Sequence, residues 1–389
     1  MRRLAAVRLR SLAAGLACAL PLVTGRAAHA ESPAPPPVRA VDLLVVVDSS
    51  PGATVDRAAL VAGLPAFTAA IGEQFRGDYA SPAIDLHVGV ITADRADHGA
   101  LRTASVETCA AAPAGGFVQY QGNQWGQVSQ NFTGTLADAI ACLVPSDTTG
   151  AAAAEPLAAI RTALDGSVPG NAGFLRADAT LAVLVITDQD DCSSTGAPLD
   201  TFACAEAAWA CTPAIDATRG PRSTCTARPV ATGLVGIYDA VNFLYSLKVS
   251  SSLIAFGVVR GAPTPVSVIS GPAIAPSCSN GARTATPGLR LDAIAAEIHN
   301  SWTEVACDDA GIDGFVVPIV AATYAPVGGD YYHGECDGGF YPGDDSGVGG
   351  HGADHAGIGC GCAAGAPHGG TGVLVALGFA VALRRRRRR

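Results

Sequence analysis

The sequence reads LLVVVDSSPG at residues 43–52 and VLVITDQDDC at residues 183–192. In both stretches a short run of leucine and β-branched side chains ends in an aspartate. Such nearly continuous apolar runs are typical of strands buried on both faces of a parallel sheet. Four runs of this kind predict the central strands of the fold, over residues 41–47, 86–92, 181–187 and 253–259.

Helical patterns separate these four runs. Between the first two, apolar side chains recur at spacings of three and four, namely Leu60, Leu64, Phe67, Ile71 and Phe75, with Pro65 as an expected kink. Similar stripes occupy 157–164, 237–247 and 289–298. The alternation predicts one α/β domain over residues 40–325. Its expected form is a doubly wound, mostly parallel sheet flanked by helices, with disulfide-held loop insertions.

The first thirty residues have the pattern of a secretory signal peptide. Four arginines precede an apolar run over 12–23, and Ala28-His29-Ala30 supplies a small-x-small cleavage pattern. We therefore expect cleavage after Ala30 and export of the chain. Residues 31–39 would then form a Pro-rich spacer ahead of the domain.

The charge balance of the exported body is strongly acidic. Five of the 25 Lys and Arg residues lie in the signal and six in the C-terminal tail, which leaves 14 against 34 Asp and Glu. Nucleic-acid binding needs clustered basic side chains that neutralise phosphates. The composition therefore excludes nucleic acid as a partner.

Cysteine usage also fits an exported protein, since disulfides persist in oxidising compartments. Eight of the twelve cysteines fall within the predicted domain: Cys109, Cys142, Cys192, Cys204, Cys211, Cys225, Cys278 and Cys307. Neighbours in the sequence predict the pairs Cys109–Cys142 and Cys278–Cys307, and the pairing of the other four stays open. Those four lie in an insertion over 192–232, which we expect to be held by disulfides rather than by a core of its own.

The composition shifts at the end of the domain. Residues 326–358 are rich in Gly, Asp and His and predict a linker, and residues 359–389 hold Cys360, Cys362, an apolar run over 373–383 and six arginines. At about 1.5 Å per helical residue the apolar run is too short for a hydrocarbon layer of roughly 30 Å. It predicts a transient anchor or a sorting tag with the cysteine pair as its processing point. Membrane contact is expected only through this tail.

Two predicted strands end in aspartate, at Asp48 and Asp188. Ligands bind at the carboxyl ends of strands in an open parallel sheet, and carboxylate and hydroxyl oxygens suit a hard divalent cation. An alternative interpretation is that Asp48 caps the following helix and Asp188 merely marks a strand end.

The first of these motifs resembles the von Willebrand factor type A domain. That family binds a metal ion through a strand-end Asp-x-Ser-x-Ser motif, a threonine from a second loop and an aspartate from a third. Asp48 and Ser50 match the first two positions, whereas Gly52 stands where the second serine belongs. This departure removes one hydroxyl ligand.

The resemblance implies roles for residues of two further loops. Thr148 would be the threonine ligand, with Thr149 as the alternate, and Asp188 would be the third-loop aspartate. Asp190 and Asp191 would support the ligands from outside or tune the charge of the site. The implied cofactor is Mg²⁺, or else Mn²⁺ or Ca²⁺. The implied partner is a protein that presents an acidic side chain to the ion.

The tail carries a second, independent resemblance. Gly-Cys-Gly-Cys, a small-residue apolar stretch and an arginine block resemble the myxobacterial C-terminal sorting signal, over about 30 residues. This implies processing near Cys360, with the protein displayed on the cell surface or outer envelope or released from it.

Together these patterns predict a cell-surface binding or adhesion module that is not an enzyme. Two alternatives stay open. The first is a structural surface protein of the same fold that binds no metal, because Gly52 replaces a ligand. The second is a secreted metal-dependent hydrolase, although neither strand-end motif contains a histidine to act as a general base.

Overall fold

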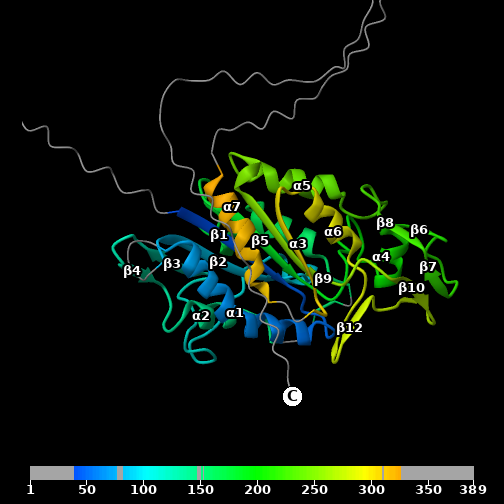
Figure 1. Cartoon of the computed structure of the whole chain (residues 1–389), viewed down its shortest axis with the longest axis horizontal. Coiled ribbons are helices and arrows are strands. Elements are labelled where there is room, and N and C mark those ends of the chain that lie inside the picture. The colour runs from blue at the N-terminus through cyan, green and yellow to red at the C-terminus, as the bar shows by residue number, and fades with distance from the viewer. Residues whose placement is uncertain (1–38, 77–81, 147–149, 152, 309–310, 326–389) are drawn as a thin grey trace, which may run out of the picture. The chain divides into compact units, whose positions relative to one another are not determined.

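The computed structural model describes residues 39–76, 82–146, 150–151, 153–308 and 311–325. Within them a seven-stranded sheet has the strand order β14-β9-β5-β1-β2-β3-β4 (Figure 1). Its strands are β1 (Arg39–Val47), β2 (Ile84–Thr92), β3 (Val118–Gly122), β4 (Val128–Gln130), β5 (Thr180–Ile186), β9 (Ile254–Arg260) and β14 (Asn300–Val305). The four predicted strands are the four at its centre, β9-β5-β1-β2.

Five neighbouring strands run parallel, and β3 and β4 extend one edge of the sheet through antiparallel pairing. β1 pairs with both β2 and β5, and β9 pairs with β5 and β14, all parallel, whereas β3 and β4 are antiparallel. The chain thus moves outward from β1 to β4 and then crosses back to β5 on the other side of β1. The strand order reverses between β1 and β5, where an open α/β sheet forms its ligand crevice.

Helices cover both faces of the sheet and enclose two apolar cores. The α-helices are α1 (Thr54–Gln74), α2 (Leu136–Ala141), α3 (Pro156–Leu164), α4 (Thr201–Ala208), α5 (Ile237–Ser246), α6 (Leu289–Ala296) and α7 (Val316–Tyr324), with short 3₁₀ turns η1 (Arg95–Asp97), η2 (Pro169–Asn171), η3 (Ser251–Leu253) and η4 (Ile312–Phe315). One core contains side chains of α1, α2 and α7, and the other contains those of α3, α5 and α6. The structure therefore confirms an α/β fold with a mostly parallel sheet between helices.

Helix α1 is the one described helix that is long and apolar enough, by length and composition, to cross a membrane. Its buried side chains Leu60, Leu64, Phe67 and Ile71 belong to the core on one face of the sheet. The helix continues through Pro65. In this fold α1 is a core helix of the domain.

The insertion that follows β5 contains more structure than the sequence suggested. It holds α4, β6 (Trp209–Thr212), β7 (Gly220–Arg222) and β8 (Thr224–Ala227), and it meets β10 (Val266–Ile269) and β11 (Ala273–Ile274). A hairpin of β12 (Cys278–Asn280) and β13 (Arg283–Ala285) follows in the chain. Figure 1 shows the insertion at the side of the sheet away from β3 and β4.

The insertion is held by two disulfides, as predicted, but it also packs into an apolar cluster that was not predicted. Trp209, Ile215 and Ala231 from the insertion pack in one buried cluster with Val266 and Val268. The last two come from a strand more than thirty residues further along the chain, about which the composition of 192–232 contains no information. Disulfides and a small apolar core hold the insertion together.

Four disulfides join the eight cysteines of the described domain. Both predicted pairs, Cys109–Cys142 and Cys278–Cys307, are confirmed, and the pairs left open are Cys192–Cys204 and Cys211–Cys225. The predicted metal ligand Thr148, its alternate Thr149 and the predicted processing residues Ala30, Cys360 and Cys362 lie outside the described residues.

Candidate functional site

Asp48 and Asp188 meet where the sheet changes direction. Their strands β1 and β5 are neighbours, and the Asp48 amide donates to the Ile186 carbonyl at 2.9 Å. The negative charge of Asp48 acts on the Asp188 carboxyl group, so the two side chains lie close together. The structure thus brings together the two predicted strand-end aspartates.

The Asp48 side chain is fixed by its own loop and by the neighbouring strand end. Its Oδ1 accepts from the Ser50 amide at 2.7 Å, and its Oδ2 accepts from the Thr187 hydroxyl at 2.8 Å. Arg57 on α1 donates to the carbonyl oxygens of Asp48 at 2.9 Å and Ser50 at 3.1 Å. These bonds set the orientation of the carboxylate before any ligand arrives.

Asp188 is in an environment that favours its neutral form. Burial, the negative charge of Asp48, the hydrogen bond with Asp48 and the charge of Asp56, in that order, raise its pKa to about 8. The side chain is 8% exposed, and its Oδ1 has no hydrogen-bond partner. A protonated Asp188 can donate to Asp48, while Oδ1 stays a free acceptor.

Gly52 makes this close arrangement possible. A Cβ atom on residue 52 would lie 2.4 Å from Asp188 Oδ2, well inside van der Waals contact. Asp188 therefore lies in the space that a side chain at position 52 would need.

A third carboxyl group adds negative charge nearby. Asp56, in the first turn of α1, has its pKa raised to about 6 by burial above all, and by the charge of Asp48, against the lowering effect of Arg283. Arg283 Nε lies 3.5 Å from Asp56 Oδ1. This acidic environment would be relieved by a cation next to Asp48 and Asp188.

The residues present fit a hydrated divalent ion rather than a cage made wholly of protein. In the described part of the chain, no three His, Cys, Asp or Glu side chains gather as a metal-binding group. Asp48, Asp188 and the Ser50 hydroxyl would supply a few oxygens, and Mg²⁺ commonly keeps several waters when only one or two carboxylates bind it. The unpartnered Asp188 Oδ1 is the oxygen most free to serve.

The predicted ligand Thr148 and its alternate Thr149 are followed directly by the described residue Gly150. Gly150, the first described residue after Thr148 and Thr149, donates through its amide to the Ser49 carbonyl at 3.2 Å. A Cβ on Gly150 would lie 2.3 Å from Ser49 Oγ. Gly150 therefore packs directly against the loop that carries Asp48 and Ser50.

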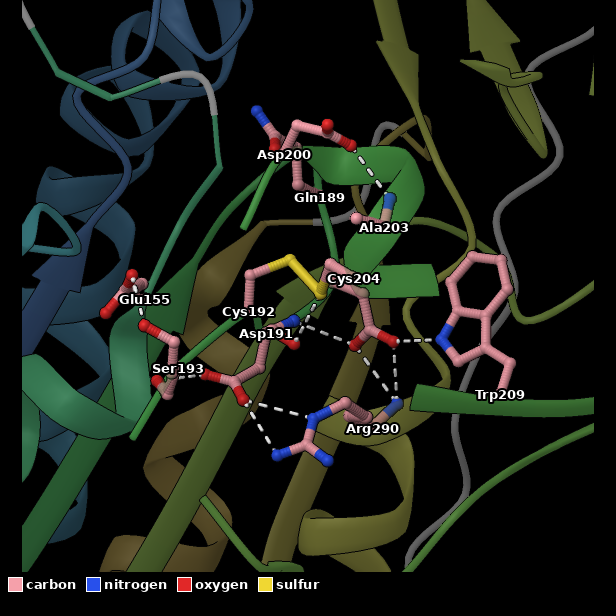
Figure 2. Close-up of a disulfide and its surroundings, with 12 residues drawn as sticks. Glu155, Gln189, Asp191, Cys192, Ser193, Asp200, Ala203, Cys204, Trp209 and Arg290 are labelled. Atoms are coloured by element: carbon pink, nitrogen blue, oxygen red, sulfur yellow. Dashed lines mark hydrogen bonds and ion pairs between the residues drawn. A yellow bond between two sulfur atoms is a disulfide. The ribbon is translucent and has the colours of Figure 1, made fainter. Parts of the chain in front are cut away.

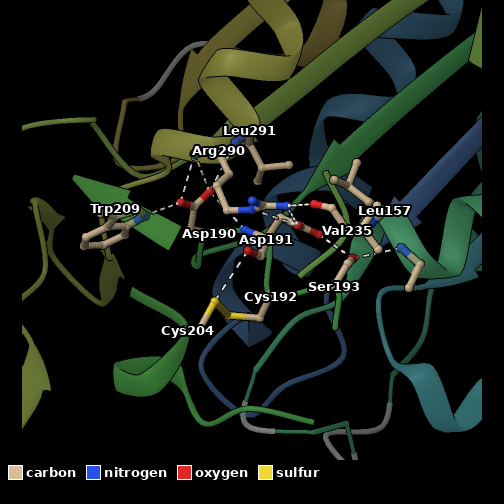
Figure 3. A network of polar contacts seen from close by, with 11 residues as sticks. Leu157, Asp190, Asp191, Cys192, Ser193, Cys204, Trp209, Val235, Arg290 and Leu291 are labelled. Atoms are coloured by element: carbon tan, nitrogen blue, oxygen red, sulfur yellow. Dashed lines mark hydrogen bonds and ion pairs between the residues drawn. A yellow bond between two sulfur atoms is a disulfide. The ribbon is translucent and has the colours of Figure 1, made fainter. Parts of the chain in front are cut away.

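Asp190 faces a helix N-terminus and an indole (Figure 3). Its oxygens accept from the backbone amides of Arg290 at 2.9 Å and Leu291 at 3.2 Å, and from Trp209 Nε1 at 2.8 Å. Burial raises its pKa to about 6, while these hydrogen bonds and the charge of Arg290 act in the lowering direction. Asp190 thereby caps α6 and fixes Trp209.

Asp191 lies in a buried ion pair. Arg290 donates to its Oδ2 through Nε and Nη2, both at 3.1 Å, and both side chains are fully buried. Its Oδ1 accepts from the Leu157 amide at the start of α3 at 3.2 Å and from the Ser193 hydroxyl at 2.5 Å. Asp190 and Asp191 thus join the end of β5 to two helices, and they support Asp188 only through the backbone between them.

A cleft of about 210 Å³ opens beside Asp188. Gln189 and Asp190 also line it, together with Trp209, Ile274, Pro276 and the Cys192–Cys204 disulfide. Figure 2 shows this disulfide tying the loop after β5 to α4, with Trp209 nearby. The insertion therefore forms one wall of a hollow next to the strand-end aspartates.

Sequence reasoning missed several residues of this site. Thr187 could have been noticed, since a hydroxyl directly before a strand-end aspartate faces the same edge. No local sequence pattern pointed to Arg57, Gln189 or Arg290, because their hydrogen-bond partners lie on other loops of the chain.

Comparison with known proteins leaves the chain without an assigned family. No protein-family profile matches it, and no curated protein matches it.

Proposed function

We propose that this protein is an exported surface module of the von Willebrand factor A type that binds a partner protein through a divalent cation. Asp48 and Asp188 would hold the ion, with Ser50 and waters. The carboxylate of an acidic side chain on the partner would complete its coordination. The parallel sheet with its order reversal between β1 and β5 supports the comparison with that family.

The observation that carries the proposal is the unpartnered Oδ1 of Asp188 beside the Asp48 carboxylate. A buried acceptor without a donor costs free energy, and two adjacent acidic groups cost more when both ionise. A divalent cation would remove both costs. When bound it supplies a Lewis-acidic position for a ligand carboxylate, while Thr187 and the Ser50 amide hold Asp48 in place.

Export is supported by the disulfides and by the sequence signals. Four disulfides in one domain are typical of proteins from oxidising compartments. The surface location rests on the sorting-signal resemblance of residues 359–389, and we propose it on that basis.

Calorimetric titration of Mg²⁺ and Mn²⁺ into the purified protein tests the proposal. We expect one equivalent to bind, and an Asp188→Asn variant to lose that binding because the amide still donates to Asp48 but cannot ligate as an anion. Glu107→Gln removes one exposed charge elsewhere and serves as the matched control. At ten times Kd the ion should stabilise the fold by about 1.4 kcal/mol, which raises Tm by about 2 °C for a domain of this length. Absence of both heat and stabilisation would contradict the proposal.

A second candidate is a surface scaffold of the same fold that binds no metal. The close approach of Asp188 to Asp48, for which Gly52 leaves the room, favours it because a protonated Asp188 would relieve the repulsion between the two groups without a cation. Gly52→Ser separates the two functions. The new side chain displaces Asp188, so Tm in EDTA should fall under both. Only the cation-binding function predicts that Mg²⁺ then restores more stability than in the wild type, through the added hydroxyl.

A further inference from the structure

The cleft beside Asp188 adds a second recognition element to the proposed cation site. We propose that it receives an apolar side chain of a peptide ligand, next in sequence to the acidic residue bound through the ion. This inference rests on the proposed function. The apolar part of its wall comes from Ala205, Trp209, Ile274, Pro276 and the Cys192–Cys204 disulfide.

The size of the cleft suits one side chain. Its volume of about 210 Å³ is below the roughly 300–1,000 Å³ of typical small-molecule sites. A single leucine, methionine or phenylalanine side chain would fill such a space. The adjoining backbone would then pass over Gln189 toward Asp188.

The walls are built before the ligand arrives. Trp209 is 3% exposed, and its indole nitrogen donates to Asp190 at 2.8 Å, so the ring is held in one orientation. The disulfide fixes α4 to the loop after β5 (Figure 2). A preformed cleft loses little side-chain freedom on binding, so apolar burial translates efficiently into affinity.

Gln189 provides a separate indication of a peptide. Its Oε1 is buried and has no hydrogen-bond partner, while its Nε2 makes only a long contact of 3.4 Å with Ser50 Oγ. A backbone N–H of a bound peptide would satisfy this acceptor. Because Gln189 lies between Ser50 and the cleft, it would fix the spacing between the two recognised side chains.

The charges in the cleft favour an apolar over a basic side chain. Asp190 already accepts from Trp209 and from two backbone amides of α6, and Asp188 would be occupied by the proposed cation. Neither carboxyl group is a free counter-charge for a lysine or arginine of the ligand. A basic preference would therefore contradict the proposal.

Selection from displayed peptides tests the cleft without a known ligand. The probe is a phage library with random residues on both sides of a fixed aspartate, selected on the immobilised full chain in millimolar Mg²⁺. We expect leucine, isoleucine, methionine or phenylalanine to be enriched at one position adjoining the aspartate. A preference for lysine or arginine there, or no enrichment at all, would overturn the inference.

Variants at the rim then locate the bound side chain. A synthetic consensus peptide should bind Ile274→Asp at least about tenfold more weakly, since a charge replaces half-buried apolar wall. The matched control is Val106→Asp, at an exposed valine outside the cleft, which should bind as the wild type does. Should Ile274→Asp fail to fold, Thr201→Trp fills the cleft from an exposed position of α4 and should cause the same loss. Unchanged binding to the folded variants would refute the assignment.

Chelation separates this inference from the proposed function. If peptides selected for an apolar residue bind equally well in EDTA, the cleft is established and the cation site fails. If peptides need Mg²⁺ but show no neighbouring preference, the cation site is established and the cleft fails.

Discussion

Asp188 is the residue on which the chemistry of this molecule depends most. It is buried beside Asp48, and glycine at position 52 leaves it just enough room. Without a cation, burial and the charge of Asp48 favour the protonated form of Asp188 by raising its pKa. With a cation both groups can be ionised. Under the proposed function, the same residue would decide whether the strand ends act as an acid pair or as metal ligands.

A pH series tests this dependence. The pKa of Asp188 rises from its usual 3.8 to about 8 in the folded protein, so without metal the folded state keeps a proton that the unfolded chain loses. That contribution to stability is fully present below about pH 4, declines as the pH rises, and is lost by about pH 8. Asp188→Asn cannot lose a proton. In EDTA, we therefore expect the urea midpoint of the variant to exceed that of the wild type increasingly up to pH 8. A constant difference between pH 5 and 8 would be inconsistent with a proton held at Asp188.

At the scale of elements, the loop after β5 connects the sheet to two helices through hydrogen bonds and an ion pair. Asp190 receives the N-terminus of α6 and Asp191 the N-terminus of α3, and Arg290 connects the two aspartates from α6 (Figure 3). Carboxylates at helix N-termini satisfy free amides and oppose the positive end of the helix dipole. The position of Asp188 at the sheet edge is thus set by two helices that contain no ligand.

Removal of Arg290 should show how much this connection contributes to the free energy of unfolding. Arg290→Met leaves Asp191 charged and fully buried, which should cost about 3–5 kcal/mol in urea unfolding. The double variant with Asp191→Asn should recover part of the loss, because no uncompensated charge remains. Arg219→Met, at an exposed arginine of the insertion, is the matched control, and a change of about 0.5 kcal/mol or less is expected there. Equal losses at the two arginines would show that the buried pair has no special role.

The sequence predicted those strands and helices whose position follows from a local pattern of apolar residues. The central strands were evident because their apolar runs are continuous, and Asp48 and Asp188 could be placed together because neighbouring parallel strands end at one edge. β14 was missed because Asn300–Val305 is partly exposed and mixes polar with apolar residues. The partners of Asp190 and Asp191 could not be predicted, since Trp209 and Arg290 approach only through the tertiary fold.

For the molecule as a whole, covalent links complement the two cores on the faces of the sheet. The disulfides close segments of 33, 12, 14 and 29 residues, and the pairs of the insertion also hold the small third core. Cross-links stabilise mainly by restricting the unfolded chain, and more so for longer segments. A protein built in this way depends on the compartment in which its thiols are oxidised.

This dependence gives a prediction about where the chain can fold. The double variant Cys109→Ser/Cys142→Ser should lose about 4 kcal/mol in urea unfolding and Cys192→Ser/Cys204→Ser about 3 kcal/mol, from the lengths of the closed segments. The losses in unfolding free energy from disulfides that lie far apart should add. The loss of all four disulfides would then approach or exceed the whole stability of a typical domain, about 5–15 kcal/mol. The full chain should therefore be protease-sensitive and lack near-ultraviolet circular dichroism when it is made in a reducing cytosol. It should be folded when the same chain is exported. A chain that folds fully with its thiols reduced would show that the apolar cores suffice, and would remove the physical reason for export.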